Sequence, residues 1–170
     1  MTRNEKYLTS DLCLKGLIIY RSGLIIYICL MISMKCKYAL KALTRLGKES
    51  GKEFIQTHLI AKEENIPKKF LEQILLELKH AKIVNSKQGI GGGYYLIKKP
   101  KDISVADVHR LFDGAIAPVP CVSLNFYEKC DDCKSETACL LRDEFIKIRE
   151  GARVIMSKTT IQSFLDSRRK

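Results

Sequence analysis

The sequence predicts a mainly α-helical protein of the α+β class, in which a winged helix-turn-helix is followed by a C-terminal dimerisation helix. Three features lead to this prediction. Successive helical patterns come first, a glycine-rich hairpin pattern follows them directly, and a long amphipathic pattern stands near the C-terminus. A length of 170 residues suits one domain, or one small domain with an extension.

Residues 1–33 do not share this organisation. Residues 17–34 are strongly apolar, but their uncharged part, residues 22–34, is shorter than the roughly 20 residues needed to span a bilayer. A signal peptide is one alternative for this stretch, and a membrane anchor is another. We expect instead a non-functional extension upstream of a true start at Met31 or Met34.

The positive charge of the chain is concentrated in one part of it. The whole chain has a formal net charge of +11. Residues 34–101 contain 15 Lys and Arg against 6 Asp and Glu, whereas residues 102–170 contain 11 of each kind. Such a basic module is typical of a protein that binds phosphates. We therefore expect residues 34–101 to bind double-stranded DNA, in a cytoplasmic protein with no membrane partner.

Three helices are expected within this basic module, over about residues 35–49, 57–64 and 67–80. Two short helices joined by a tight turn at residues 65–67 form the plan of a helix-turn-helix. Apolar residues at helical spacing mark the buried sides of the first and third helices. These residues are Ala39, Ala42, Leu43, Leu46, Leu71, Ile74, Leu75 and Leu78.

A β-hairpin is expected directly after the third helix. Residues 83–87 and 94–97 have strand patterns, and the loop between them holds four glycines. A nucleotide-binding phosphate loop is an alternative, but no Gly-Lys-Ser/Thr sequence follows and the loop leads into a strand rather than a helix. A hairpin wing beside a helix-turn-helix is the better interpretation. A short helix over residues 103–112, capped by Ser104 or Asp102, follows the wing.

The residues expected to contact DNA lie at the start of the third helix and in the wing. Lysines there are placed to contact phosphates, and polar side chains near the helix start are placed to reach base edges. The predicted DNA-contacting residues are Lys68, Lys69, Phe70, Glu72, Gln73, Lys87, Gln88 and Gly91.

Four of the seven cysteines lie in one stretch, residues 121–139, which we call the cysteine segment. Their spacing is C-x8-C-x2-C-x5-C, over Cys121, Cys130, Cys133 and Cys139. A C-x2-C pair lets two sulfurs point the same way from a tight turn, as zinc and iron–sulfur sites both require. Spacing alone does not choose between these metals. A disulfide framework is less favoured, because nothing else in the chain indicates export.

A long amphipathic helix is expected over residues 137–157. Its apolar residues recur at spacings of 4, 3, 4 and 3, which is the pattern of a coiled-coil seam. A helix that packs on its own domain is the alternative. The seam favours a homodimer formed through Leu141, Phe145, Ile148, Ala152 and Ile155. A homodimer would place two recognition helices one DNA turn apart on a palindromic operator.

Several segments of the chain together resemble a known family. They are KCKYALKAL, IPKKFLEQILLELKHAKIVNSKQGIGGGYYL, ISVADVHRLFDG and the cysteine segment, within residues 34–165. The combination is similar to the Rrf2 family of bacterial winged-helix regulators. The resemblance implies a homodimeric transcription factor. For members that bind a cluster, it implies three cysteines between wing and dimerisation helix that hold an iron–sulfur cluster, whose state changes DNA affinity.

The sequence departs from the family pattern at three positions. Gln88 stands where the family wing commonly has an Arg able to enter the minor groove. Arg142 and Lys37 stand where some members supply a fourth cluster ligand, a His and an Asp respectively. The surplus cysteine is the economical replacement, so that Cys121 and Cys130 complete the set begun by the closing C-x5-C pair.

These observations predict a DNA-binding transcriptional regulator, of repressor type, whose operator affinity is set by an iron–sulfur cluster or by another metal such as zinc. A zinc- or thiol-based winged-helix regulator is the alternative within the same class. A small redox enzyme using Cys130 and Cys133 belongs to a different class. No βαβ pattern surrounds that pair and no histidine or general base is near it, so we predict that the protein is not an enzyme.

Overall fold

The structure, a computed structural model, describes residues 32–49, 54–89, 91–133 and 135–167, with the backbone of four residues in the N-terminal extension. Those four form strands β1 (Ile18–Ile19) and β2 (Ile25–Ile26), which pair antiparallel. The other expectations for residues 1–31 lie outside the described residues. Among the helices of the described part, none has the length and apolarity that crossing a membrane requires.

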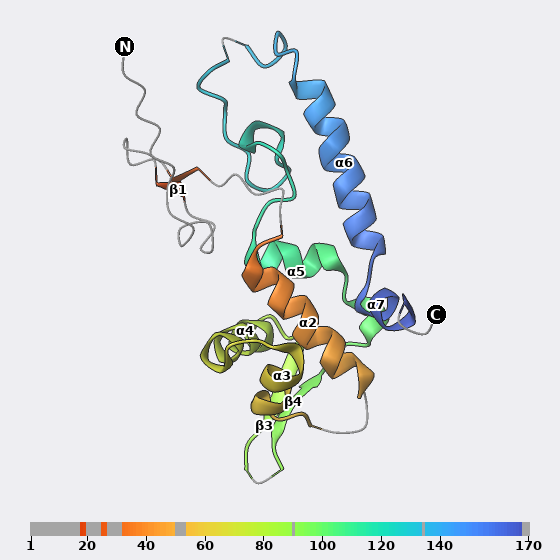
Figure 1. The fold of residues 1–170 in the computed structure, drawn as a ribbon. Helices are drawn as coiled ribbons and strands as arrows, with labels where there is room; N and C mark the ends of the chain where they lie inside the picture. The colour runs from red at the N-terminus through yellow and green to blue at the C-terminus, as the bar shows by residue number, and fades with distance from the viewer. Residues whose placement is uncertain are drawn as a thin grey trace.

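Three helices open the main body of the described chain (Figure 1): α2 (Met34–Lys48), α3 (Thr57–Glu64) and α4 (Lys68–His80). The Ser33 hydroxyl accepts a hydrogen bond from the Cys36 N–H at 3.1 Å, which caps α2. Asn65 takes the left-handed conformation, with φ 53°, and so ends α3. Pro67 is the N-cap of α4 rather than its first residue as predicted, because its ψ of 125° is extended.

The predicted apolar stripes of the first and third helices form the core of the molecule. All eight of these residues are at most 2% exposed. Burying each Leu or Ile side chain stabilises the fold by about 1.5–3 kcal/mol relative to leaving it in water. Val108 of α5 (Val105–Phe112) and Ile161 of α7 (Ile161–Ser167) join the same core. Both later helices therefore pack directly on the helix-turn-helix.

The wing is a two-stranded antiparallel hairpin of β3 (Val84–Lys87) and β4 (Gly93–Leu96), with Val84 opposite Leu96. Ile55 adds an isolated bridge to Tyr94, through hydrogen bonds of 3.0 and 2.9 Å. This close approach requires glycine at the neighbouring position, since a Cβ on Gly93 would lie 2.4 Å from the Ile55 carbonyl oxygen. The predicted winged helix-turn-helix fold is confirmed.

Behind the wing, the chain passes through the 3₁₀ helix η1 (Pro100–Asp102) into α5. Ser104 is the N-cap of α5 and forms a capping box with Asp107. Ser104 also pairs in an isolated bridge with Thr160, just before α7. The segment that leads into α7 therefore lies beside the start of α5, as Figure 1 shows.

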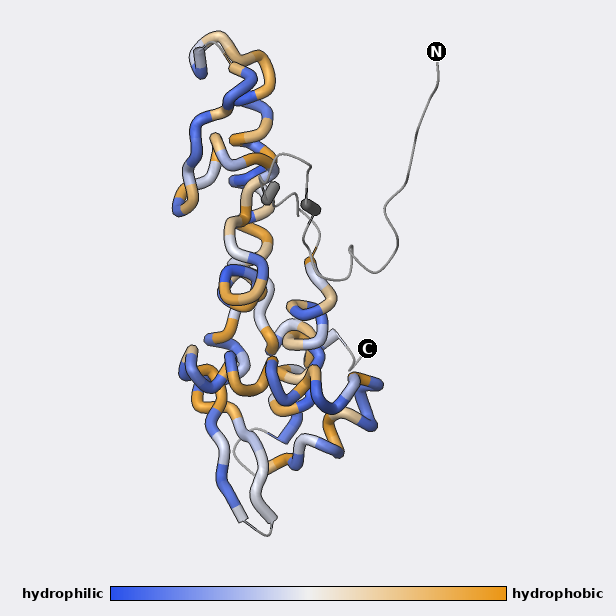
Figure 2. The backbone as a smooth tube through the Cα atoms, turned by 90° about the vertical axis from the view of Figure 1, so that its left-hand side faces the viewer, coloured by the Kyte–Doolittle hydropathy of each residue, from blue (hydrophilic) through white to orange (hydrophobic). Residues whose placement is uncertain are grey.

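The cysteine segment and α6 (Arg142–Lys158) extend away from this core. Figure 2 shows the wing at one end of the molecule and the cysteine segment at the other. The helix begins five residues later than the predicted start at Thr137, which corrects that boundary. Residues 137–141 instead form successive turns, in which N–H groups donate three residues back, as Cys139 N–H does to the Glu136 carbonyl oxygen at 3.3 Å.

Candidate DNA-binding surface and cysteine site

The first two turns of α4 carry most of the residues predicted to contact DNA. Lys68, Lys69, Glu72 and Gln73 are all exposed. They share the side of the helix opposite the buried stripe, because they alternate with it at helical spacing. Lys68 lies 3.9 Å from Glu72 in an exposed i,i+4 pair, which contributes little to stability and leaves the lysine available to a phosphate. This surface combines lysines with uncharged and acidic polar side chains, as helices that contact DNA commonly do.

Phe70 differs from its neighbours on α4. Its ring is partly buried and packs edge-on against Tyr38 of α2, with ring centroids 5.9 Å apart. It also lies against the hydrophobic core. The structure therefore shows a packing contact for Phe70. This contact helps to set the angle between α2 and α4, the predicted recognition helix.

The tip of the wing holds the remaining predicted DNA contacts. Lys87, Gln88 and Gly91 are exposed. The Lys87 ammonium lies 5.4 Å from the centre of the Phe54 ring, which is a cation–π contact. Gly89 and Gly91 have φ values of 103° and 77°, which a side chain at either position would strain. The tip of the wing thus exposes Lys87, Gln88 and glycine backbone.

Three thiols of the cysteine segment are neighbours. The Cys133 thiol interacts with the side chains of Cys130 and Cys139, and these hydrogen bonds raise the pKa of Cys133 to about 12. The backbone supports the C-x2-C turn, since the Cys133 N–H donates to the Cys130 carbonyl oxygen at 3.4 Å. Cys133 is the centre of this group of three, and the predicted convergence of all four thiols on one metal remains a prediction.

The Cys139 thiol lies at the start of α6. The pKa of Cys139 lies below its ordinary value, chiefly because of a hydrogen bond from the Leu141 backbone. Hydrogen bonds from Cys133 and from the Arg142 backbone lower this pKa to a smaller extent. The charge of the Arg142 side chain acts in the same direction. Thiolate is the form that binds metals and attacks oxidants, so this environment prepares Cys139 for either role.

Cys121 is held in a different way, through its backbone. Its carbonyl oxygen accepts a hydrogen bond from the Arg142 guanidinium at 2.5 Å, and Arg149 donates to the carbonyl oxygen of Val122 at 2.6 Å. Both arginines belong to α6, so they fix the 3₁₀ helix η2 (Pro120–Val122) against it. In the part of the chain that the structure describes, no three or more His, Cys, Asp or Glu side chains form a preassembled metal site. The four-cysteine ligand set remains a prediction.

The helix α6 offers an unburied apolar stripe. None of its described residues is buried. Of the predicted seam residues, Leu141, Ile148 and Ile155 are 61%, 48% and 67% exposed, and Phe145 and Ala152 are partly buried. A stripe of this kind on a long helix is the surface that a partner helix covers.

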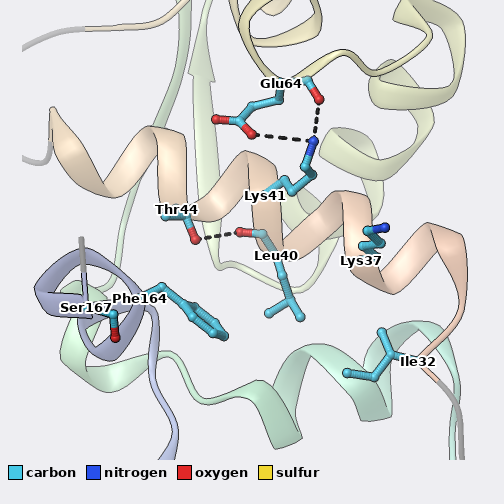
Figure 3. A pocket seen from close by; sticks show the side chains of 8 residues that line it. All are labelled: Ile32, Lys37, Leu40, Lys41, Thr44, Glu64, Phe164 and Ser167. Atoms are coloured by element: carbon cyan, nitrogen blue, oxygen red, sulfur yellow. Dashed lines mark hydrogen bonds and ion pairs between the residues drawn. The ribbon is translucent and has the colours of Figure 1, made fainter.

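A groove of about 470 Å³ lies on the outer side of α2, against α7 (Figure 3). Ile32, Leu40 and Phe164 provide its apolar lining. Lys41 crosses one edge, where its ammonium donates to the Glu64 carbonyl oxygen at 2.5 Å. Lys37 of α2 also lines this groove. The position that resembles the Asp ligand of some family members therefore carries a basic side chain in this chain.

The fold and these surfaces define a winged helix-turn-helix DNA-binding regulator with an appended cysteine segment and long helix. Comparison with known proteins gives the family. Residues 32–167 match the family model Rrf2, described as an iron-dependent transcriptional regulator. The chain belongs to the Rrf2 family. It is a transcriptional regulator and not an enzyme, as the sequence predicted.

Two curated relatives and one solved structure belong to the same class of regulators, and a second solved structure shares the fold. An rrf2-like HTH-type transcriptional regulator of Rhodobacter capsulatus is 42% identical over 138 residues, covering 79% of this chain and 92% of the relative. CymR of Bacillus subtilis is 31% identical, with 77% and 86% coverage. The CymR structure aligns at a TM-score of 0.68, covering 82% of this chain and 98% of CymR. The T. potens IscR structure, 24% identical with 81% and 88% coverage, aligns at 0.63 and supports the fold alone.

Two features of the site were missed at the level of sequence. The clamp of Arg142 and Arg149 on the start of the cysteine segment has no spacing signal, because its contacts span 21 and 27 residues. A buried group of polar side chains around Asp113 was also missed. The signal for it was a cysteine, a histidine and an aspartate at positions where the helical pattern expects apolar residues.

Proposed function

We propose that this regulator binds a palindromic operator as a homodimer, and that an iron–sulfur cluster or another metal held by the cysteine segment sets its operator affinity. The observation that carries the proposal is that the thiols of Cys130 and Cys139 lie near enough to that of Cys133 to raise its pKa, just before α6 begins. Thiolates are the ligands of iron–sulfur clusters and of structural zinc. The donor set therefore suits the group.

The residues that would hold the metal are Cys130, Cys133 and Cys139, with Cys121 as the fourth candidate. A bound cluster would supply sensitivity to oxidants, which zinc lacks because it is redox-inactive. The chain's own part is to bring the thiols together and to connect them to α6 through the Leu141 and Arg142 backbone. Order or disorder of the segment would then bias the position of α6.

The exposed stripe of α6 supports the dimer. A seam with apolar residues such as Ile155, 67% exposed, is unfavourable in water unless another chain covers it. Two copies joined along α6 would carry two α4 helices on one duplex. DNA contacts from Lys68, Lys69 and Lys87 would supply affinity, and Glu72 and Gln73 would supply sequence preference.

The deciding experiment is anaerobic purification of the protein, followed by an absorption spectrum and analysis for iron, sulfide and zinc. The proposal expects a coloured protein with iron and sulfide, and an operator affinity that changes when the metal is removed. Colourless protein with stoichiometric zinc would exclude the cluster and leave the DNA-binding function intact. Operator affinity that is the same with and without metal would exclude metal control.

A thiol-based sensor is the second candidate, favoured by the unequal pair of Cys133 and Cys139. The Cys139 pKa is lowered, whereas that of Cys133 is raised. A peroxide could oxidise the Cys139 thiolate to a sulfenic acid, with loss of water or alcohol from the peroxide. The Cys133 thiol would then attack that sulfur, and the sulfenic hydroxyl would leave with the thiol proton as water, which forms a disulfide. The structurally similar CymR is described as the global cysteine regulator of B. subtilis. Metal-free protein that forms this disulfide and loses operator affinity would identify this mechanism.

A further inference from the structure

A cluster of polar side chains lies buried between the end of α5 and the start of α2. Its centre is Asp113, the residue that follows α5. One carboxylate oxygen of Asp113 accepts a hydrogen bond from the Ser33 N–H at 3.1 Å. The same oxygen lies 3.7 Å from Nε2 of His109, and both side chains are 3% exposed. The Cys36 thiol also lies near this carboxylate, which helps to raise the pKa of the thiol.

The side chains of Cys36 and His109 are buried beside the Asp113 carboxylate. Cys36 is fully buried, and its pKa is raised by burial and then by the charge of Asp113, so it remains a neutral thiol beside the carboxylate. Nδ1 of His109 is buried without a hydrogen-bond partner among the described residues. A buried carboxylate is tolerated where such donors compensate it. The Ser33, Cys36 and His109 contacts therefore hold Asp113 in one place.

Asp113 stands where the chain leaves the DNA-binding core for the cysteine segment. The N–H groups of Asp113 and Gly114 both donate to the His109 carbonyl oxygen, at 2.7 and 3.2 Å. Gly114, with φ 84°, then turns the chain out of α5. Asp113 is therefore the last residue of this buried cluster before the chain turns toward the cysteine segment.

Ser33, the partner of Asp113, lies at the start of α2, which packs on α4, the predicted recognition helix. Ser33 caps α2, and the first turns of α2 touch α4 at two places. Lys35 pairs with Glu77 at 2.8 Å, and Tyr38 packs on Phe70. A shift of the α2 N-terminus would therefore be transmitted to the helix that presents Glu72 and Gln73.

We propose that Asp113 is a positioning residue that couples the state of the cysteine segment to the orientation of the recognition helix. The inference rests on the proposed function, since it concerns how that regulation reaches DNA. The plain alternative is that Asp113 only caps α2 and stabilises the fold. A capping role would alter stability, whereas a coupling role would alter the ratio between two operator affinities.

The test compares operator affinity of the full chain in two states: reconstituted anaerobically with ferrous iron and sulfide, and stripped with a chelator. Wild-type protein should show a ratio of about tenfold between the states, the usual size of such a coupling. Asp113→Asn should reduce the ratio to within about twofold. Asp113→Glu, which keeps the charge, should restore part of it. The matched control is Asp107→Asn, because Asp107 belongs to the capping box of α5, where its exposed carboxylate pairs with Ser104 and Arg110.

A second measurement uses the wild-type chain and needs no variant. Stripping should accelerate hydrogen exchange at the amides of Ser33 and Cys36, which the cluster protects. A wild-type affinity ratio of one would refute metal control, and with it this inference. A wild-type response that Asp113→Asn leaves unchanged, or one without altered exchange at Ser33, would overturn the inference while leaving the proposed function standing.

Discussion

The guanidinium of Arg142 donates a hydrogen bond to the carbonyl oxygen of Cys121 at 2.5 Å, although 21 positions separate the two residues. The same side chain pairs with Glu136 at 3.1 Å. Glu136 lies between Cys133 and Cys139, and it also accepts a hydrogen bond from the Tyr127 hydroxyl. Arg142 therefore brings the beginning and the end of the cysteine segment to one place on α6.

Removal of the Arg142 side chain should weaken metal binding without removing a ligand. We expect Arg142→Ala to lower metal affinity by about tenfold, the lower end of the effect of groups that position ligands. Lys147→Ala is the matched control, because Lys147 pairs only with Glu144 in the described structure and both are well exposed. Competition with a coloured chelator measures both affinities. Equal affinities in the two variants would show that Arg142 plays no part in the site.

Replacement of the cysteines separates a cluster from zinc. We expect visible absorption in anaerobic protein, abolished by Cys133→Ala or Cys139→Ala because Cys133 is the centre of the thiol contacts. Absorption should at least weaken with Cys121→Ala or Cys130→Ala. Cys36→Ala is the internal control, since Cys36 is buried in α2 away from the segment and should be dispensable for absorption. Full absorption in the Cys133 variant would reject this ligand set.

DNA binding should depend strongly on salt through three lysines. The triple variant Lys68→Ala, Lys69→Ala, Lys87→Ala should weaken binding to all sequences. It should also flatten the plot of log K against log salt by roughly 0.9 for each phosphate that the protein no longer neutralises. Glu72→Ala or Gln73→Ala should instead change sequence preference, by about 1–3 kcal/mol at the base concerned. Fluorescence anisotropy at several salt concentrations tests this, and an unchanged slope in the triple variant contradicts the assigned surface.

Dimerisation should depend on the exposed stripe of α6. Phe145→Asp or Ile148→Asp would place a charge within a dry interface and should give monomers with weakened operator binding. Lys147→Asp changes charge on the same helix but outside the stripe, and it should remain dimeric. Light scattering distinguishes these results. If both stripe variants stay dimeric, the subunits meet along another surface.

Stability should fall at mildly acidic pH because of His109. Burial lowers the pKa of His109, against the opposing effect of Asp113, and Arg110 lowers it further. The buried Cys36 thiol faces the same carboxylate from α2 and stays neutral. The folded state thus takes up its proton at lower pH than the unfolded state, in which the pKa is about 6.5. Its contribution to stability is full above that value and is lost as pH falls towards the folded pKa.

Urea unfolding between pH 8 and pH 5 measures this dependence. His109→Leu should flatten the curve of unfolding free energy in that range, because it removes the titrating group at similar volume. His58→Gln is the control, since His58 is exposed on α3 and should leave the slope unchanged. An identical slope in the His109 variant would assign the acid sensitivity to other groups.

Local patterns in the sequence were sufficient for the helices and the wing. The buried stripe of α4, Leu71 to Leu78, follows from apolar residues at helical spacing, and the wing follows from a run of glycines between two strand patterns. These signals depend on residues within a few positions of one another. The late start of α6 was missed because the turns of the cysteine segment compete with the helix over residues 137–141.

The sequence by itself determined the class of fold, the basic surface and the spacing of four cysteines, since each is a property of neighbouring residues. Only the tertiary structure decided that Cys133 meets Cys130 and Cys139 while Cys121 is held by Arg142 through its carbonyl oxygen. It also decided that Phe70 packs inward and that Asp113 meets Ser33, 80 positions away. Such contacts depend on the path of the whole chain, because burial and hydrogen bonding join groups that no local spacing relates.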